Sequence, residues 1–94
     1  GLVRPVNGYY GADDLEIATV ARDLAGYGIE PRHLRPFRTA ADREVSLVEQ
    51  VTLPLRHSRQ EGSPARAEEM AREISATCLR LHTALVRAAL ARGS

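Results

Sequence analysis

The sequence contains no lysine, one cysteine and very few aromatic residues. All 13 of its basic residues are arginines, and 12 acidic residues balance them to a formal charge of +1. A domain that binds nucleic acid by itself usually carries a basic patch or a high pI. This balance therefore argues against direct DNA binding by these 94 residues.

The single cysteine, Cys78, cannot form a disulfide within the chain, and nothing else in the sequence indicates an oxidising compartment. No apolar run approaches the roughly 18 residues that a membrane span needs, and no signal-peptide pattern opens the chain. We therefore expect a cytoplasmic protein without membrane contact. Because residue 1 is glycine rather than methionine, we expect the chain to be part of a longer protein.

The most informative stretch is residues 64–92, which predicts one long helix. Ser63 can cap its first amides, and Pro64 suits the first helical position. A helix of this length spans roughly 43 Å at 1.5 Å per residue, so we expect it to project or to meet a second copy. Its apolar residues recur at alternating steps of four and three, which is typical of a seam facing a partner helix: Ala67, Ala71, Ile74, Cys78, Leu81, Leu85 and Ala88.

The rest of the chain predicts a mainly α fold with a short N-terminal β-ribbon, two short helices and then a long antiparallel helical hairpin. Glycines, Pro5 and Asn7 in residues 1–10 favour a tight turn between short extended pieces. Asp13 and Glu16 have the spacing of a capping box at the start of the first helix. Gly28 would end that helix as a left-handed cap.

Prolines mark the predicted limits of the next elements. Pro31 opens a second short helix, which Pro36 interrupts. An apolar stripe from Phe37 to Leu55 predicts a third helix, which Pro54 bends or ends. The polar loop at residues 57–62 is short, so the third and last helices should pack antiparallel. We divide the chain into residues 1–35 and residues 36–94, packed as one domain.

Five short motifs follow one another in the first third of the chain: Gly1-Leu2-Val3-Arg4-Pro5, Gly8-Tyr9-Tyr10, Asp14-Leu15, Gly28-Ile29 and Leu34-Arg35. Their order resembles the wing and the following helices of the winged helix-turn-helix unit in the MerR family of bacterial transcription regulators. Residues 28–44 are similar to the C-terminal part of actinobacterial MerR-like regulators of the FtsR type.

The resemblance implies the C-terminal dimerisation and effector-sensing domain of a MerR-family DNA-binding transcription regulator. The family's first two helices, which include the recognition helix, precede the wing and are absent from this chain. The wing also has Tyr10 where the family commonly has an arginine for phosphate contact. The resemblance to FtsR-type proteins implies a complete DNA-binding unit further upstream, so that the wing in this chain belongs to a second, degenerate winged helix. Promoter DNA would therefore be bound through the missing N-terminal domain and not through this fragment.

Two sets of residues are candidates for binding. Aromatic and cationic side chains could form a groove for a small-molecule or peptide effector: Tyr27, His33, Arg35, Phe37 and Arg38. Alternatively, Tyr27 and Phe37 only hold the short helices onto the hairpin. Apolar residues late in the last helix extend past the reach of its hairpin partner, so we expect a homodimer in which a second subunit covers Leu81, Leu85, Val86, Ala89 and Leu90.

Catalysis and metal binding have little support. No nucleophile arrangement or phosphate-binding loop is present, and we expect neither an enzyme nor a cofactor. Cys78 and His82 lie one helical turn apart, a spacing that metal sites use. A lone cysteine on an apolar seam nevertheless favours a buried structural thiol, and we predict no metal site. The alternative function is a protein-interaction module that binds a peptide or helix of another factor.

Overall fold

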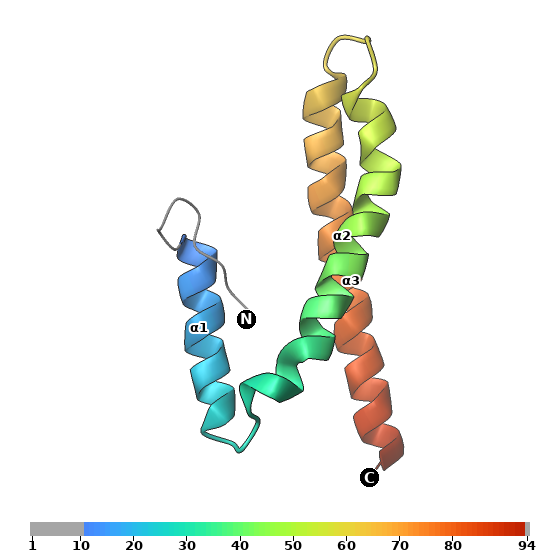
Figure 1. Cartoon of the computed structure of the whole chain (residues 1–94). Helices are drawn as coiled ribbons and strands as arrows, with labels where there is room; N and C mark the ends of the chain where they lie inside the picture. Colours follow the sequence, from blue (N-terminus) through green and yellow to red (C-terminus); the bar gives the residue numbers. More distant parts are fainter. Residues whose placement is uncertain (1–10, 94) are drawn as a thin grey trace. The chain divides into compact units, whose positions relative to one another are not determined.

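The computed structural model describes residues 11–93, and all regular structure within them is helical (Figure 1). The elements are α1 (Ala12–Ala25), a 3-10 helix (Pro31–Leu34), α2 (Arg35–Arg56) and α3 (Ser63–Gly93). The chain divides into two compact units, Gly1–Ala41 and Asp42–Ser94. The first unit contains α1, the 3-10 helix and the first turns of α2, whereas the second contains the rest of α2 and all of α3.

The predicted fold class is wrong in its β-ribbon. No strand occurs in residues 11–93, and residues 1–10, where the ribbon was predicted, lie outside the part that the structure describes. The predicted break at Pro36 is also wrong, because α2 begins at Arg35 and continues through this proline. Proline is tolerated in the first turn of a helix, where its missing N–H has no intrahelical acceptor.

Helix α1 begins one residue before the predicted start, at Ala12. The carboxylate of Asp14, rather than the predicted pair of Asp13 and Glu16, closes this end by accepting a hydrogen bond from the Gly11 N–H at 3.1 Å. Both Asp13 and Asp14 lie in the first turn, where negative charge favours the helix dipole.

The C-terminal end of α1 is closed by a glycine in the left-handed region, as the sequence predicts. Gly28 has φ 90°, its N–H donates to the Ala25 carbonyl at 2.9 Å, and the N–H of Ile29 donates to the Leu24 carbonyl at 3.0 Å. These two bonds satisfy carbonyls that the last helical turn leaves without partners. The chain then turns into the 3-10 helix, which places Leu34 in a buried position.

In the second unit, α2 and α3 lie side by side near the loop that joins them, forming a helical hairpin (Figure 1). The buried residues are small: Thr52 and Val48 on α2, and Ser63 and Ala67 on α3. Ala67 is 0% exposed. Small side chains at facing positions let two helices approach closely, so the closed end of the hairpin is its best-packed part.

The seam of α3 continues through half-buried residues and then stops. Met70, Ala71, Ile74 and Cys78 are each half-buried, whereas every residue from Leu79 to Gly93 is exposed. The predicted seam included Leu81, Leu85 and Ala88, which carry the same spacing beyond Cys78. The hairpin therefore buries only the first half of the seam that the sequence encodes.

Candidate interaction surfaces

The first candidate surface is the apolar part of α3 beyond Cys78. Leu81 and Leu85 are each 59% exposed, and Leu90 is 68% exposed. A leucine that is exposed singly is ordinary, but a group of them on one helix marks an interaction surface. We call the residues predicted for the dimer interface, all of which are exposed, the α3 surface: Leu81, Leu85, Val86, Ala89 and Leu90.

The helical period divides the apolar side chains of this segment into two separate rows. Leu81 and Leu85 are four residues apart and continue the line of Ile74 and Cys78. Leu79 and Val86 are seven residues apart and form a second row, with exposures of 64% and 43%. Together the two rows make an apolar surface that extends further around the helix than a single straight partner helix can contact. A partner that buries both rows must therefore contact α3 with more than one helix.

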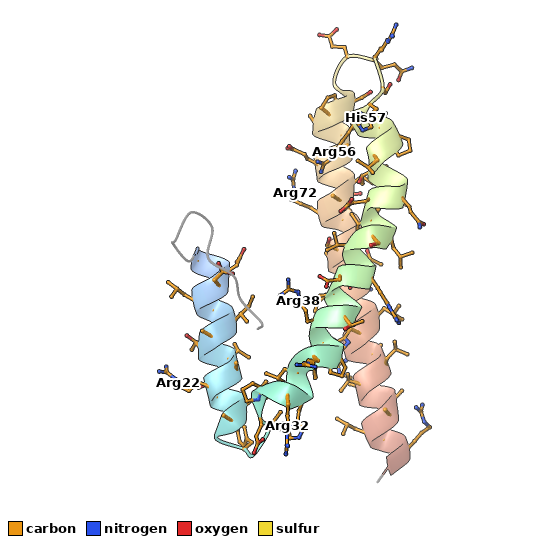
Figure 2. All side chains as sticks on the ribbon, viewed as in Figure 1. Arg22, Arg32, Arg38, Arg56, His57 and Arg72 are labelled. Carbon is orange, nitrogen blue, oxygen red and sulfur yellow. The ribbon has the colours of Figure 1, made fainter. Side chains whose placement is uncertain are left out.

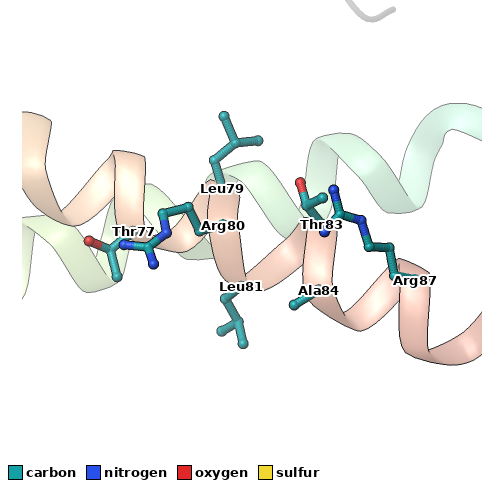
Figure 3. Close-up of a pocket in the computed structure, with 7 residues that line it drawn as sticks. All are labelled: Thr77, Leu79, Arg80, Leu81, Thr83, Ala84 and Arg87. Carbon is teal, nitrogen blue, oxygen red and sulfur yellow. The ribbon is translucent and has the colours of Figure 1, made fainter.

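The opposite side of the same segment carries arginines and has a shallow hollow (Figure 3). Figure 3 shows Leu79 and Leu81 projecting from opposite sides of the helix, with the guanidinium groups of Arg80 and Arg87 extending along it. All the residues that line this hollow come from α3 alone. Because one helix cannot enclose a small molecule, the hollow by itself is not a ligand site.

The second candidate surface is a groove in the first unit, which we call the α1 groove. It has a volume of about 270 Å³. Leu34 is almost fully buried and Leu24 and Ala21 are half-buried, so they form its floor. Its lining is almost entirely apolar and comes from α1, the 3-10 helix and the start of α2: Glu16, Ile17, Val20, Ala21, Leu24, Leu34 and Phe37.

Of the five residues predicted for an effector groove, Phe37 lines the α1 groove and the other four do not. Tyr27 is 84% exposed. His33 accepts a hydrogen bond at Nδ1 from the Glu30 N–H at 2.9 Å and so helps to start the 3-10 helix. Arg35 is exposed at the first position of α2. Arg38, labelled in Figure 2, is half-buried and lies one turn further along.

Sequence reasoning did not place the aliphatic lining of the groove in a binding site. Ile17, Val20, Ala21 and Leu24 form the expected apolar face of α1, and such a face usually packs against a core. The sequence does contain one indication of the groove: few apolar residues elsewhere in the first unit are available to cover that face of α1. Among residues 26–41 of the first unit, only Leu34 and Phe37 line the groove on that face.

Chemical sites are not apparent elsewhere in residues 11–93. No group of three His, Cys, Asp or Glu side chains in this part of the chain is placed to hold a metal ion. Cys78 is half-buried on the hairpin seam, and His82 is exposed on the next turn. None of the helices in this part is long and apolar enough to cross a membrane.

Comparison with known proteins gives a family match over the whole chain. The family model described as "Rv1828-like, C-terminal domain" matches residues 1–94. The chain is 43% identical over 83 residues to the HTH-type transcriptional regulator Rv1828 of Mycobacterium tuberculosis, and equally to its Mycobacterium bovis counterpart Mb1859. These matches cover 88% of this chain but 34% of each relative, so the chain spans about a third of their length. No solved structure matches.

Proposed function

Since the chain belongs to the Rv1828-like C-terminal domain family, we propose that it is the dimerisation and effector-sensing domain of an HTH-type transcription regulator. The observation that carries the proposal is the α3 surface, where the hairpin leaves Leu81 and Leu85 each 59% exposed. Two curated relatives of about three times the matched length are named as HTH-type transcriptional regulators. Promoter DNA would be bound by the remainder of such a protein in the cytoplasm, not by this domain.

Dimerisation through the α3 surface is supported by the energy that burial would release. Burying a leucine side chain fully stabilises a protein by about 1.5–3 kcal/mol, and about half of each side chain is still exposed on Leu81 and Leu85. A second copy offers the same rows of leucines, and twofold symmetry lets one surface cover itself. The dimer would then hold two DNA-reading units at one fixed separation.

The regulator would belong to the MerR family and be of the FtsR type. Support comes from the order of the motifs in residues 1–35 and from Gly28, whose φ of 90° fits the glycine that precedes the second helix of that pattern. The wing-like residues lie outside the described part of the chain. The long last helix, 31 residues in the structure, suits the pairing helix of such regulators.

Effector sensing would involve the start of α2. Phe37 is 60% exposed and lines an apolar groove, while Arg38 lies half-buried on the same helix. A ligand that contacts Phe37 and Arg38 would act at the start of α2, which continues into the hairpin, and would regulate by favouring one conformation of the dimer. Phe37→Ala should weaken such a ligand about tenfold or more if its ring is covered in the complex.

The alternative function is a protein-interaction module without small-molecule sensing. The volume of the α1 groove, about 270 Å³, favours this alternative, because it is below the roughly 300 Å³ at which pockets for drug-sized ligands begin. A helix or extended peptide needs only two or three apolar side chains in such a groove. A protein partner that binds the wild-type domain but not the Phe37→Ala variant would favour this alternative.

Sedimentation velocity of two matched variants tests the dimer. Leu85→Asp places a charge in the α3 surface and should convert the dimer to monomer. Leu47→Asp makes the same change on α2 at a nearly equal exposure, 58% against 59%, and should leave the dimer intact. If Leu47→Asp dissociates the protein and Leu85→Asp does not, the interface lies on α2 rather than on the α3 surface.

A further inference from the structure

We propose that the α1 groove is covered, in the full-length regulator, by an amphipathic helix from the polypeptide segment that precedes this chain, with a basic edge lying along α1. The inference rests on the proposed function, because it takes the domain as the C-terminal part of a longer regulator. It assigns an occupant to a surface of the first unit, whereas the proposed dimerisation involves α3 in the second unit. It also specifies the chemistry of that occupant.

The first observation is the groove itself. Val20 and Ile17 are 43% and 39% exposed on one wall, and Phe37 is 60% exposed on the other, while Leu34 forms a floor that is only 4% exposed. A lining of this kind, with a single carboxylate from Glu16, is matched by aliphatic or aromatic side chains. Its position between two helices suits a third helix that inserts side chains at intervals of three and four residues.

The second observation is the charge along one edge of α1. Asp13, Glu16, Val20 and Asp23 follow one another at steps of three and four residues, so they share one face of the helix. Three of the four are acidic. Arg22, the basic residue in the last turn of α1, points away from the start of α2 in Figure 2. An occupant with arginine or lysine along the matching edge would therefore complement α1 electrostatically.

The third observation is where the rest of the polypeptide lies. The family is a C-terminal domain, and the matched region is 34% of each curated relative, so most of a relative's chain precedes this region. The first described helix, α1, begins at Ala12, and it supplies five of the seven residues that line the groove. Within residues 11–93, the α1 groove is thus the apolar surface nearest in sequence to the preceding segment.

An occupied groove would connect the DNA-reading part to the hairpin. The occupant would contact Phe37 and Leu34, and Phe37 lies on α2, which runs on into the hairpin. A ligand that contacted Phe37 would compete with the docked helix. The groove would then be the place where an effector alters the link between the two parts of the regulator.

Thiol labelling at a single introduced cysteine tests the proposal. In a Cys78→Ala background, Val20→Cys reports on the groove and Ala18→Cys reports on the exposed far side of α1. In the full-length regulator the thiol at position 20 should react about tenfold or more slowly than in the 94-residue chain, because a covered thiol reacts only during transient opening. The thiol at position 18 should react equally fast in both.

Charge reversal tests the basic edge in the same assay. Glu16→Arg in the full-length regulator should restore fast labelling at position 20, whereas Arg22→Glu, on the far side, should not. Equal labelling of position 20 in the full-length protein and in the 94-residue chain would overturn the proposal. So would protection in the 94-residue chain that increases with its concentration, since a second copy would then be the occupant.

These outcomes are separate from those of the dimer test. If Leu85→Asp leaves the mass unchanged, dimerisation through α3 fails while the labelling result stands. If position 20 labels equally in both proteins, the groove assignment fails while the α3 surface is unaffected. The two variants lie on different helices and in different units of the chain.

Discussion

Enlarging Ala67 should destabilise the hairpin because no space is left around its side chain. Ala67 is 0% exposed at the closed end of the α2–α3 seam, where Thr52 is 1% and Val48 is 8% exposed. Ala67→Leu adds three carbon atoms at this point. Inserting extra methylene groups into a well-packed core typically costs 1–3 kcal/mol, so we expect a loss of about 2 kcal/mol in the free energy of unfolding.

Ala76→Leu is the matched control for this substitution. Position 76 is exposed on the same helix, and leucine and alanine have similar helix propensities, so the change should stay within about 0.5 kcal/mol. Urea unfolding followed by circular dichroism, at one fixed chain concentration so that association does not contribute, measures both. If the two variants have the same midpoint and slope, the helices are not closely packed at Ala67 and the account of the seam is wrong.

Three further predictions concern α1 and DNA. Gly28→Ala should cost about 1–2 kcal/mol of stability in urea unfolding, because φ is 90° there and a side chain is strained in that region even where space is open; a neutral result would contradict the left-handed cap. Asp14→Ala should cost about 0.5–1 kcal/mol by removing the acceptor of the Gly11 N–H, as for other N-terminal caps, and Asp13→Ala should cost less. The 94-residue chain, with a formal charge of +1, should show no sequence-dependent gel shift with duplex DNA at physiological salt, and a specific shift would contradict the proposal that another domain binds the promoter.

The ends of the helices could be predicted from the sequence where they depend on nearby capping residues or on a glycine. The long last helix begins at Ser63, one residue before the predicted start, and the cap at Gly28 lies where glycine's freedom of φ indicates. The predicted break at Pro36 was wrong because proline, which breaks a helix interior, is accepted in the first turn of a helix. Asp13 and Glu16 have capping spacing, but the structure uses Asp14, which lies three residues after the N-terminal flanking residue Gly11.

The candidate binding surfaces could not be predicted in the same way, because their exposure depends on tertiary packing between segments that are distant in the sequence. Periodicity identified the seam of α3, yet it could not show that the hairpin covers this seam only as far as Cys78. The apolar face of α1 was also evident, but whether such a face is buried or open depends on which other residues reach it. Tyr27 illustrates the same limit, since it was a candidate for a groove and is instead 84% exposed.

The central claim is that a second copy covers the α3 surface, and contacts between differently labelled chains test it most directly. Isotope-filtered nuclear Overhauser spectra of a mixture of labelled and unlabelled chains report only protons that are close across two copies. We predict intermolecular signals from the methyl groups of Leu81, Leu85 and Val86. Intermolecular signals confined to α2 residues such as Leu47 and Val51, or no such signals at a concentration of several hundred micromolar, well above the dissociation constant of a micromolar dimer, would contradict it.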